Sequence, residues 1–244
     1  MTSTHDTIII GAGQAGPGLA STLDRRGERV ALIEAGPFGG TCLNDGCRPT
    51  KALRASARAA HLARASAPLG VTAGDVVVDL AVAVGRKDAL IDGWRTRYEG
   101  YFGGHETIEY VRGHAAFVGT EPDGAHRVAV GDRELTASRV ILNTGARSVA
   151  PDVRGLDRID WLDHHRILDL TDLPSHLIIV GGSYIGLELG QFFHRFGSEV
   201  TVVERAPRLV GREDPESSEA IAEFLSEEGL SIRTGTSIEM VGTT

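Results

Sequence analysis

The clearest hydrophobic pattern in the chain is a pair of short β-branched runs, each followed directly by a glycine-rich turn. Positions 8–10 read Ile-Ile-Ile and positions 178–180 read Ile-Ile-Val. Apolar runs of this kind, bounded by glycine, are typical of β-strands. After each turn come a helical stretch, a further glycine, a second β-branched run and an acidic residue. The pattern therefore predicts the order strand, turn, helix and strand, and predicts it twice.

The two stretches form an internal repeat in which position 8 aligns with position 178, an offset of 170 residues, without a gap. The matched positions are Gly11, Gly13, Gly16, Gly27, Val30 and Glu34 in the first copy and Gly181, Ser183, Gly186, Gly197, Val200 and Glu204 in the second. This order of elements is that of the βαβ dinucleotide-binding unit. A single copy could be a structural turn, but two copies with equal spacing favour two dinucleotide-binding units.

Each repeated position has a physical role in such a unit. The first glycine permits the tight turn, the second lets the backbone approach a pyrophosphate, and the third lets the helix pack closely on the strand. The pyrophosphate then meets free N–H groups at the helix N-terminus. Glu34 and Glu204 end the second strands and are expected to bind ribose hydroxyls. Ser183 replaces the middle glycine, so a looser approach of the dinucleotide is expected there.

The chain between the repeats predicts two helices and a group of strands. An Ala- and Arg-rich stretch at 51–67 follows Pro49, a signal for a helix N-terminus, and 80–102 reads as a second helix. Short alternating segments at 109–143 predict antiparallel strands. A stretch containing Pro and Gly at 150–156 is the candidate linker. It divides the chain into a first domain of 1–149 and a second of 150–244.

Composition narrows the class of protein. The net charge is −8, which argues against nucleic acid or an anionic membrane as partner, because Lys and Arg drive phosphate binding. No apolar run reaches the roughly 18–20 residues of a membrane span. The chain holds 31 glycines without a Gly-X-Y period, and its two cysteines do not form a disulfide-stapled scaffold. A soluble, cytoplasmic globular protein is expected.

Both cysteines lie in the run GGTCLNDGCRPTK at 39–51, just before the predicted helix at 51–67. The four residues between Cys42 and Cys47 permit a small disulfide ring, and a helix N-terminus lowers the pKa of a thiol. An accessible thiol of low pKa beside a second thiol is what dithiol–disulfide exchange requires. The alternatives are two ordinary cysteines or half of a metal site. No bound metal is expected, because no His or Cys stands nearby at a zinc-site spacing.

Four motifs together carry a resemblance to a known family. GAGQAG at 11–16, the CxxxxC run, ILNTGAR at 141–147 and GGSYIGLE at 181–188 resemble, in order, the class I pyridine nucleotide–disulfide oxidoreductases. This family includes dihydrolipoamide dehydrogenase, glutathione reductase and mercuric reductase, and the wording around Cys42 is closest to the mercuric-reductase-like branch. The resemblance implies an α/β fold of two Rossmann-like domains, the first binding FAD and carrying an antiparallel β-meander, the second binding NAD(P).

The resemblance also implies roles for individual residues. Cys47 would lie against the flavin as the charge-transfer thiolate, and Cys42 would be the interchange thiol that attacks the acceptor. Lys51 would lie near flavin N5, paired with Glu188, and Tyr184 would cover the nicotinamide side of the flavin and move when the nicotinamide enters. Taken singly, the last three residues read as a solvated lysine, a surface glutamate and a packing tyrosine.

The expected cofactor contacts follow from the same motifs. For FAD they are Gly11, Gly13, Gly16, Glu34, Gly40, Thr41, Ala115, Thr144 and Gly145, and for NAD(P) they are Gly181, Ser183, Gly186, Glu204 and Arg205. Glu204 favours NADH, because a carboxylate binds the 2′-hydroxyl and repels a 2′-phosphate. Arg205 and Arg208 would bind that phosphate if Glu204 turned away. Arg48 and Thr50 depart from the family's usual Val or Ile and Ser, which is expected to alter the charge near the thiols.

The resemblance implies a longer protein than 244 residues. The family continues with the rest of the second domain and a dimerisation domain that supplies acceptor-site residues, so the dimerisation domain is expected to be absent here and a homodimer is expected of the full-length relative. The expected activity passes electrons from NAD(P)H through FAD and the Cys42–Cys47 disulfide to a small-molecule disulfide, a thiol-bound metal or a quinone. The alternatives are a diaphorase or transhydrogenase that does not use the cysteines, and a truncated, non-catalytic flavin-binding remnant.

Overall fold

A computed structural model describes residues 2–243. The chain divides into two compact units, the first formed by residues 1–49 and 88–147 and the second by 50–87 and 148–244. Each unit has its own sheet and its own hydrophobic core. The units are discontinuous in sequence, and the consecutive domains of 1–149 and 150–244 therefore stay a prediction.

The first unit contains a mixed sheet of six strands in the order β3-β2-β1-β6-β5-β4. The strands are β1 (Thr2–Ile10), β2 (Val30–Glu34), β3 (Ile108–Arg112), β4 (Ala115–Thr120), β5 (His126–Val130) and β6 (Arg133–Leu142). β1 is parallel to β2 and β6, and β2 is parallel to β3, while β4, β5 and β6 form an antiparallel meander. The predicted α/β class with a mixed sheet is confirmed.

The prediction of antiparallel strands throughout 109–143 is wrong at both ends of that range. β3 pairs in parallel with β2, and β6 pairs in parallel with β1 while remaining antiparallel to β5. The reason is the long helix α4 (Leu80–Gly103), which precedes β3 and provides the crossover that a parallel pair requires. Local alternation of apolar residues does not distinguish these two pairings.

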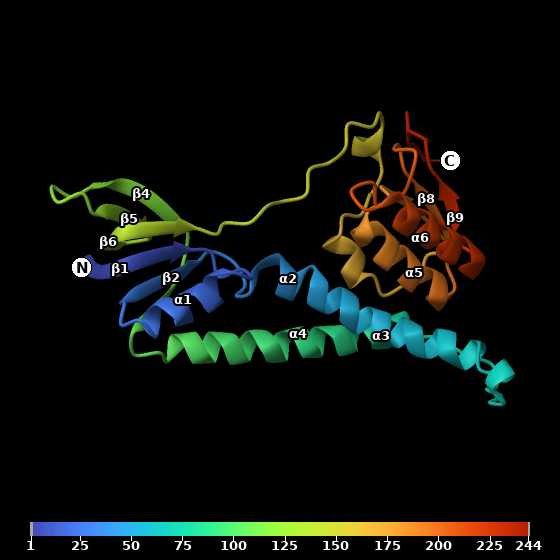
Figure 1. The fold of residues 1–244 in the computed structure, drawn as a ribbon, viewed down its shortest axis with the longest axis horizontal. Helices are drawn as coiled ribbons and strands as arrows, with labels where there is room; N and C mark the ends of the chain where they lie inside the picture. Colours follow the sequence, from blue (N-terminus) through green and yellow to red (C-terminus); the bar gives the residue numbers. More distant parts are fainter. Residues whose placement is uncertain (1, 244) are drawn as a thin grey trace. The chain divides into compact units, whose positions relative to one another are not determined.

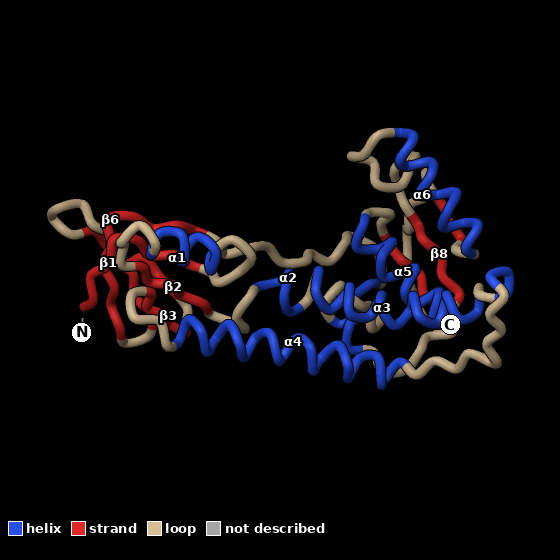
Figure 2. Tube along the Cα trace, turned by 60° about the horizontal axis from the view of Figure 1, so that its bottom comes forward, coloured by secondary structure: helices blue, strands red, loops and turns tan. Residues whose placement is uncertain are grey.

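Both faces of the central strands in the first unit are covered. Ile9 packs beneath α1 (Gly16–Asp24) with Phe102 of α4, whereas Ile8 packs against the meander with Val128 and Leu135. Figure 1 shows α1 and α4 on one side of this sheet, and Figure 2 shows β1, β2, β3 and β6 beneath α1. Ile8 and Ile9 are both fully buried, and each such side chain contributes about 1.5–3 kcal/mol to folding.

The second unit contains a parallel sheet of three strands, β7 (His176–Val180), β8 (Glu199–Val203) and β9 (Ser231–Arg233). α5 (Tyr184–Phe196) and α6 (Pro215–Glu228) join these strands and pack on them over Phe192 and Leu225. Among the described residues the opposite face of β7 stays open, because Ile178 and Val180 are 58% and 59% exposed.

The internal repeat is also a structural repeat. In the first unit Ile8 pairs with Ala31, and in the second Ile178 pairs with Thr201, so both pairs of strands have the same register at an offset of 170 residues. β1, β2 and β3 therefore correspond to β7, β8 and β9. The two glycine turns occupy the same place in this framework, at the carboxyl end of the first strand.

The remaining helices lie close to where the sequence predicts them. α4 agrees with the predicted helix at 80–102, while α3 (Cys47–Arg64) begins four residues before the predicted start at 51. Pro49 lies in the first turn of α3, where its missing N–H has no cost. The short elements are α2 (Gly40–Asn44), η1 (Ala67–Leu69), η2 (Leu156–Arg158) and η3 (Arg166–Asp169). The candidate linker has a contact of its own, since Val241 N donates to Arg154 O at 2.9 Å.

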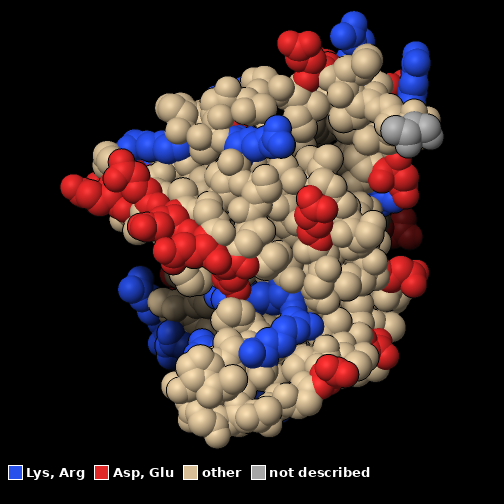
Figure 3. Space-filling view, turned by 90° about the vertical axis from the view of Figure 1, so that its right-hand side faces the viewer, with Lys and Arg blue, Asp and Glu red and all other residues tan. Residues whose placement is uncertain are grey.

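The surface charge is unevenly distributed. Figure 3 shows acidic side chains gathered in a band on one face, with basic side chains next to its lower end. α6 carries four exposed glutamates, Glu216, Glu219, Glu223 and Glu227. None of the helices within residues 2–243 combines the length and apolarity needed to cross a bilayer.

Candidate functional site

The first glycine turn is closed by a carboxylate. Gly11 N donates to Ile33 O at 2.8 Å, which joins the turn to the end of β2. Glu34 accepts from the backbone N–H of Ala12 through Oε2 and from that of Gly36 through Oε1, each at 2.8 Å. Glu34, which is predicted to bind the ribose, thus stabilises the turn through hydrogen bonds of its own.

The second turn has the same hydrogen bonds. Gly181 N donates to Val203 O at 2.9 Å, and Glu204 accepts from Gly182 N at 2.6 Å and from Ala206 N at 2.7 Å. Burial alone would raise the pKa of Glu204, but these N–H groups and the positive charge of Arg205 lower it overall. Glu204 is therefore an ionised acceptor at the point where the second unit would bind a ribose.

The first and third glycines are required by close backbone approaches. A Cβ on Gly11 would lie 2.1 Å from Asn143 O, and one on Gly16 would lie 2.3 Å from Gly11 O. Gly186 repeats this geometry, since its Cβ would lie 2.5 Å from Gly181 O. Ser183 caps α5 without a side-chain hydrogen bond to the helix, so its hydroxyl does not close the second turn.

The middle glycine of the first turn is in contact with the cysteine-bearing segment. A Cβ on Gly40 would lie 2.8 Å from the Cα of Gly13, whereas a Cβ on Gly13 would meet nothing closer than 3.6 Å. Gly40 also has a φ of +58°, in the left-handed region that favours glycine. Two bare backbones therefore lie against each other where the resemblance implies a pyrophosphate, and Thr41 follows as the next residue of α2.

Asn143 supports this turn, and its role was not predicted. Its side-chain Nδ2 donates to Gly11 O at 3.0 Å, and its backbone N donates to Ile10 O at 2.8 Å. The motif at 141–147 pointed only to Thr144 and to Gly145, which has a φ of +73°. Because an asparagine directly after a strand can serve many purposes, no local pattern indicates that its amide reaches the glycine turn.

Ala115 follows, by two residues, a glycine that is hydrogen-bonded to the carboxyl end of β2. It is the first residue of β4 and pairs with Val130. Two residues earlier, Gly113 N donates to Glu34 O at 2.8 Å. The backbone near Ala115 is thus tied to the strand end that carries the ribose ligand, and its contact with adenine stays a prediction.

The two cysteines lie together as free thiols. Cys42 is in α2 and Cys47 opens α3, and the two thiols are close enough for Cys47 to shift the pKa of Cys42. Gly46 allows this approach, since a Cβ there would lie 3.0 Å from Thr41 O. Cys47 is the more exposed of the two.

The surroundings of Cys42 raise the pKa of its thiol. Burial raises the pKa of the Cys42 thiol, and contact with Cys47 raises it further, while a backbone hydrogen bond from Cys47 and the positive charge of Arg48 act in the opposite direction. α2 has only five residues, so it offers little dipole to offset the burial.

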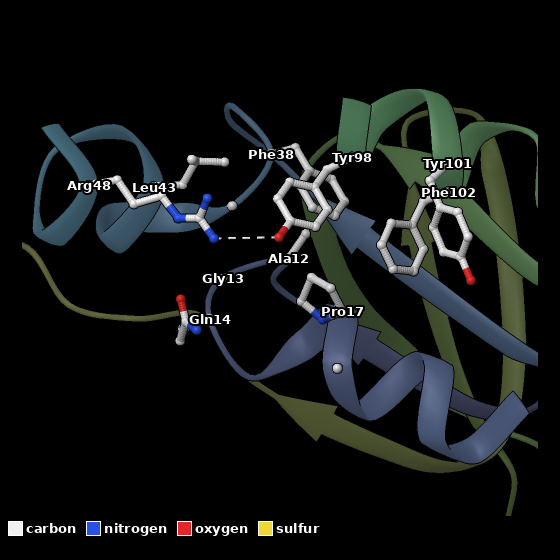
Figure 4. A pocket seen from close by; sticks show the side chains of 12 residues that line it. Ala12, Gly13, Gln14, Pro17, Phe38, Leu43, Arg48, Tyr98, Tyr101 and Phe102 are labelled. Atoms are coloured by element: carbon white, nitrogen blue, oxygen red, sulfur yellow. Dashed lines mark hydrogen bonds between the residues drawn. The ribbon is translucent and has the colours of Figure 1, made fainter. Parts of the chain in front are cut away.

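A pocket of about 320 Å³ lies in the first unit, and its lining includes Leu43 and Arg48, the residues that directly follow the two cysteines in the chain. Figure 4 shows its lining side chains, with Gln14 from the glycine turn and Pro17 from the start of α1 facing Tyr98 from α4 and Arg48 from α3. Leu43, the neighbour of Cys42, also lines it. The motifs singled out the glycine turn and the cysteines, but the share of α4 in this pocket is a tertiary feature that they did not reveal.

Lys51 and Glu188 are brought together within the second unit. Lys51 Nζ donates to both carboxylate oxygens of Glu188 at 2.7 Å, and Arg54 Nη1 donates to Oε1 at 3.0 Å. Tyr184, the first residue of α5, is 67% exposed. In the part of the chain that the structure describes, no group of three or more His, Cys, Asp or Glu side chains could hold a metal ion.

Comparisons with known proteins place these features in a family. The model of the pyridine nucleotide-disulphide oxidoreductases matches residues 5–244. A mercuric reductase from Bacillus cereus is 38% identical over 97% of this chain and 37% of its own length, and the mitochondrial dihydrolipoyl dehydrogenase of Pisum sativum is 33% identical over 98% and 48%. The structure of the HOCl-induced flavoprotein disulfide reductase RclA from Escherichia coli, solved as a Cu(II) complex, matches with a TM-score of 0.82 and 32% identity, covering 99% of this chain and 52% of that one. The chain therefore spans about half or less of the length of these relatives, and it belongs to the pyridine nucleotide-disulphide oxidoreductase family.

Proposed function

We propose that this chain provides the flavin- and nicotinamide-binding part of an oxidoreductase that moves electrons from NAD(P)H to the Cys42–Cys47 pair. From there the electrons pass to a small-molecule disulfide or a thiol-bound metal. One observation carries the proposal. The segment that bears the two neighbouring thiols begins at Gly40, which lies against Gly13 of the first dinucleotide turn.

The residues of the first unit fit a dinucleotide with a flavin. Gly13 and Gly40 provide a side-chain-free surface for the pyrophosphate, and Glu34 is placed to bind the ribose at the end of β2. Thr41, Ala115, Thr144 and Gly145 provide the further contacts that the family implies. Bound FAD would supply the chemistry that cysteine lacks, accepting a hydride and passing on two electrons.

The thiols then perform the exchange. The Cys42–Cys47 disulfide takes up two electrons and two protons and becomes a dithiol. Cys42, as the interchange thiol, attacks the acceptor sulfur, and Cys47 attacks Cys42 in turn, which re-forms the protein disulfide and releases the reduced acceptor.

The second unit supplies the nicotinamide site and a positioned cation. Its glycine turn and Glu204 would bind the nucleotide, with NADH preferred because the ionised carboxylate repels a 2′-phosphate. Tyr184 would cover the nicotinamide side. Glu188 holds Lys51 by both oxygens, so that its ammonium group would stabilise negative charge on the flavin ring. A homodimer in the cytoplasm is the assembly that we propose for the full-length protein.

The assignment of Cys47 is tested by reducing the FAD-loaded chain with NADH in the absence of oxygen. We expect a long-wavelength absorbance from a thiolate lying against the flavin, present in the wild type and in Cys42→Ser but lost in Cys47→Ser. Ser66→Ala is a matched control far from the turn in sequence. If the absorbance persists in Cys47→Ser, the assigned role is wrong. If Cys42→Ser loses nothing in turnover with a disulfide acceptor, the cysteines are not used at all.

A further inference from the structure

Arg48 brings a charge to the pocket beside the cysteines. Of the described residues that line this pocket, Arg48 alone is charged, and the others are glycines, aromatic and aliphatic side chains and the amide of Gln14. The family's usual residue here is Val or Ile. The chain therefore has a cation where the resemblance implies an apolar side chain.

Two aromatic side chains of α4 hold the guanidinium group in place. Arg48 Cζ lies 4.5 Å from the ring centroid of Trp94 and 6.0 Å from that of Tyr98, and Nη2 donates to the Tyr98 hydroxyl at 3.5 Å. Stacking of this kind uses the flat face of the guanidinium group and leaves N–H groups at its edge for a ligand. Figure 4 shows the guanidinium group pointing toward Tyr98 at the pocket.

The same guanidinium group acts on the thiols. Arg48 directly follows Cys47 in α3, and its positive charge lowers the pKa of Cys42 against the effect of burial. Leu43, next to Cys42, lines the pocket together with Arg48. The pocket, the cation and the thiol pair therefore form one neighbourhood within the first unit.

We propose that Arg48 selects the acceptor by binding a carboxylate of a small thiol compound, which reaches the cysteines either as a disulfide or as the thiolate ligand of a metal ion. An arginine fork matches a carboxylate in geometry and charge. The pocket, at about 320 Å³, has room for a compound of that class and not for a protein chain. The inference rests on the proposed function, because it requires exchange at the cysteine pair.

The cysteine pair reduces a disulfide acceptor in two steps. The Cys42 thiolate forms a bond to one sulfur of the acceptor, the acceptor S–S bond breaks, and one carboxylate-bearing thiolate leaves and takes up a proton. Cys47 then forms a bond to Cys42 and releases the second thiol. The acceptor gains two electrons and two protons, and the protein dithiol loses them. With a metal complex, Cys42 replaces one thiolate ligand and no electron is transferred in that step.

The first experiment needs no flavin. The full chain is reduced with a phosphine and desalted, and its oxidation is followed with dithiodipropionate, which carries two carboxylates, and with uncharged hydroxyethyl disulfide. We expect Arg48→Met to lower the ratio of the rate with the dianion to the rate with the neutral disulfide by about fivefold. Both rates should also share a smaller loss, because removing the positive charge raises the pKa of Cys42. Arg26→Met, an exposed arginine after α1, removes the same charge elsewhere and should change neither rate. Arg48→Lys should keep part of the preference, and high salt should abolish it in the wild type.

Two further measurements distinguish the acceptor source and the outcomes. In a second arm, mercuric ion complexed by mercaptopropionate or by mercaptoethanol replaces the disulfides. A charge preference that depends on Arg48 supports the proposal in either arm, and the arm in which it occurs shows whether the acceptor is a disulfide or a thiol-bound metal. Alkylation of the cysteines by iodoacetate relative to iodoacetamide should fall in Arg48→Met. An unchanged alkylation ratio, or equal charge preferences in wild type and Arg48→Met, overturns the selection by Arg48 but leaves the proposed thiol chemistry standing. No exchange in any arm overturns the proposed thiol chemistry, and the selection with it.

Discussion

Replacement of Gly16 by alanine is the sharpest test of the geometry of the first glycine turn. A Cβ on Gly16 would lie 2.3 Å from Gly11 O, well inside the 3.0 Å that Cβ atoms keep from other heavy atoms. The atom it meets is backbone, which cannot rotate away. Two residues along the same helix, Gly18 has nothing within 4 Å of its Cβ position. Gly16→Ala and Gly18→Ala are therefore the same chemical change in α1 with opposite expected effects.

The expected magnitudes follow from these two environments. Forcing a methyl group into a packed site costs about 1–3 kcal/mol, so Gly16→Ala should lower the free energy of unfolding by that amount. Gly18→Ala should raise it by about 0.5–1 kcal/mol, because alanine loses less backbone entropy in a helix. The two variants should thus differ by about 1.5–4 kcal/mol.

The assay follows the first unit alone. Trp94 lies in the first unit and Trp161 in the second, so in a Trp161→Phe background tryptophan fluorescence reports on the unit that contains α1. Urea titration then gives the free energy of unfolding of each variant. If Gly16→Ala is as stable as Gly18→Ala, the close approach of the helix to the turn is wrong, and with it the reason for a third glycine.

Three further predictions concern buried charges and the second turn. His5 is 7% exposed, and burial lowers its pKa from 6.5, although Glu109 acts in the opposite direction. The neutral histidine is thus favoured in the folded chain, so the free energy of unfolding should be highest above pH 6.5 and should fall as the pH decreases below it. His5→Asn should flatten this pH dependence in urea titrations. Glu228, whose side chain is 8% exposed, pairs with Arg195, and Glu228→Ala should cost about 3–5 kcal/mol against almost nothing for exposed Glu227→Ala. Glu204→Ala should lower the NADH-to-NADPH ratio of binding affinities by at least tenfold, measured by calorimetry, because it removes the repulsion of a 2′-phosphate.

Each of these predictions has a result that would contradict it. An unaltered pH slope in His5→Asn would mean that the histidine is protonated or solvated in the folded chain. Equal stability of the Glu228→Ala and Glu227→Ala variants would mean that the ion pair between Arg195 of α5 and Glu228 of α6 does not stabilise the fold. An unchanged nucleotide ratio in Glu204→Ala would mean that the carboxylate does not face the nucleotide.

Much of the fold follows from the sequence because its signals are local. The run of three isoleucines, the glycine turn and the acidic residue at the strand end are set within about thirty residues, and the same arrangement recurs at 178–204 with the same strand register. The pairing of β3 and of β6 was not predictable in this way. Their neighbours are determined by which strands lie next to each other in space, and apolar alternation carries no record of direction.

In the candidate site, too, local features could be predicted from the sequence and long-range contacts could not. The cysteine pair and the carboxylates Glu34 and Glu204 stand in motifs whose spacing indicates their chemistry, and the structure shows their contacts. The amide of Asn143 on the glycine turn is a long-range contact, across more than 130 residues of sequence. The aromatic support of Arg48 by α4 is of the same kind. Burial of Cys42, which raises the pKa of its thiol, also depends on packing that no local pattern records.

The central claim is that electrons from NADH reach the two sulfurs. The most direct measurement is a count of reactive thiols in the oxidised, FAD-loaded chain before and after anaerobic addition of one equivalent of NADH. The account predicts no reactive thiol before the addition and two afterwards, both mapped to Cys42 and Cys47 by mass spectrometry. A chain whose nicotinamide is consumed while the count stays at zero would contradict it.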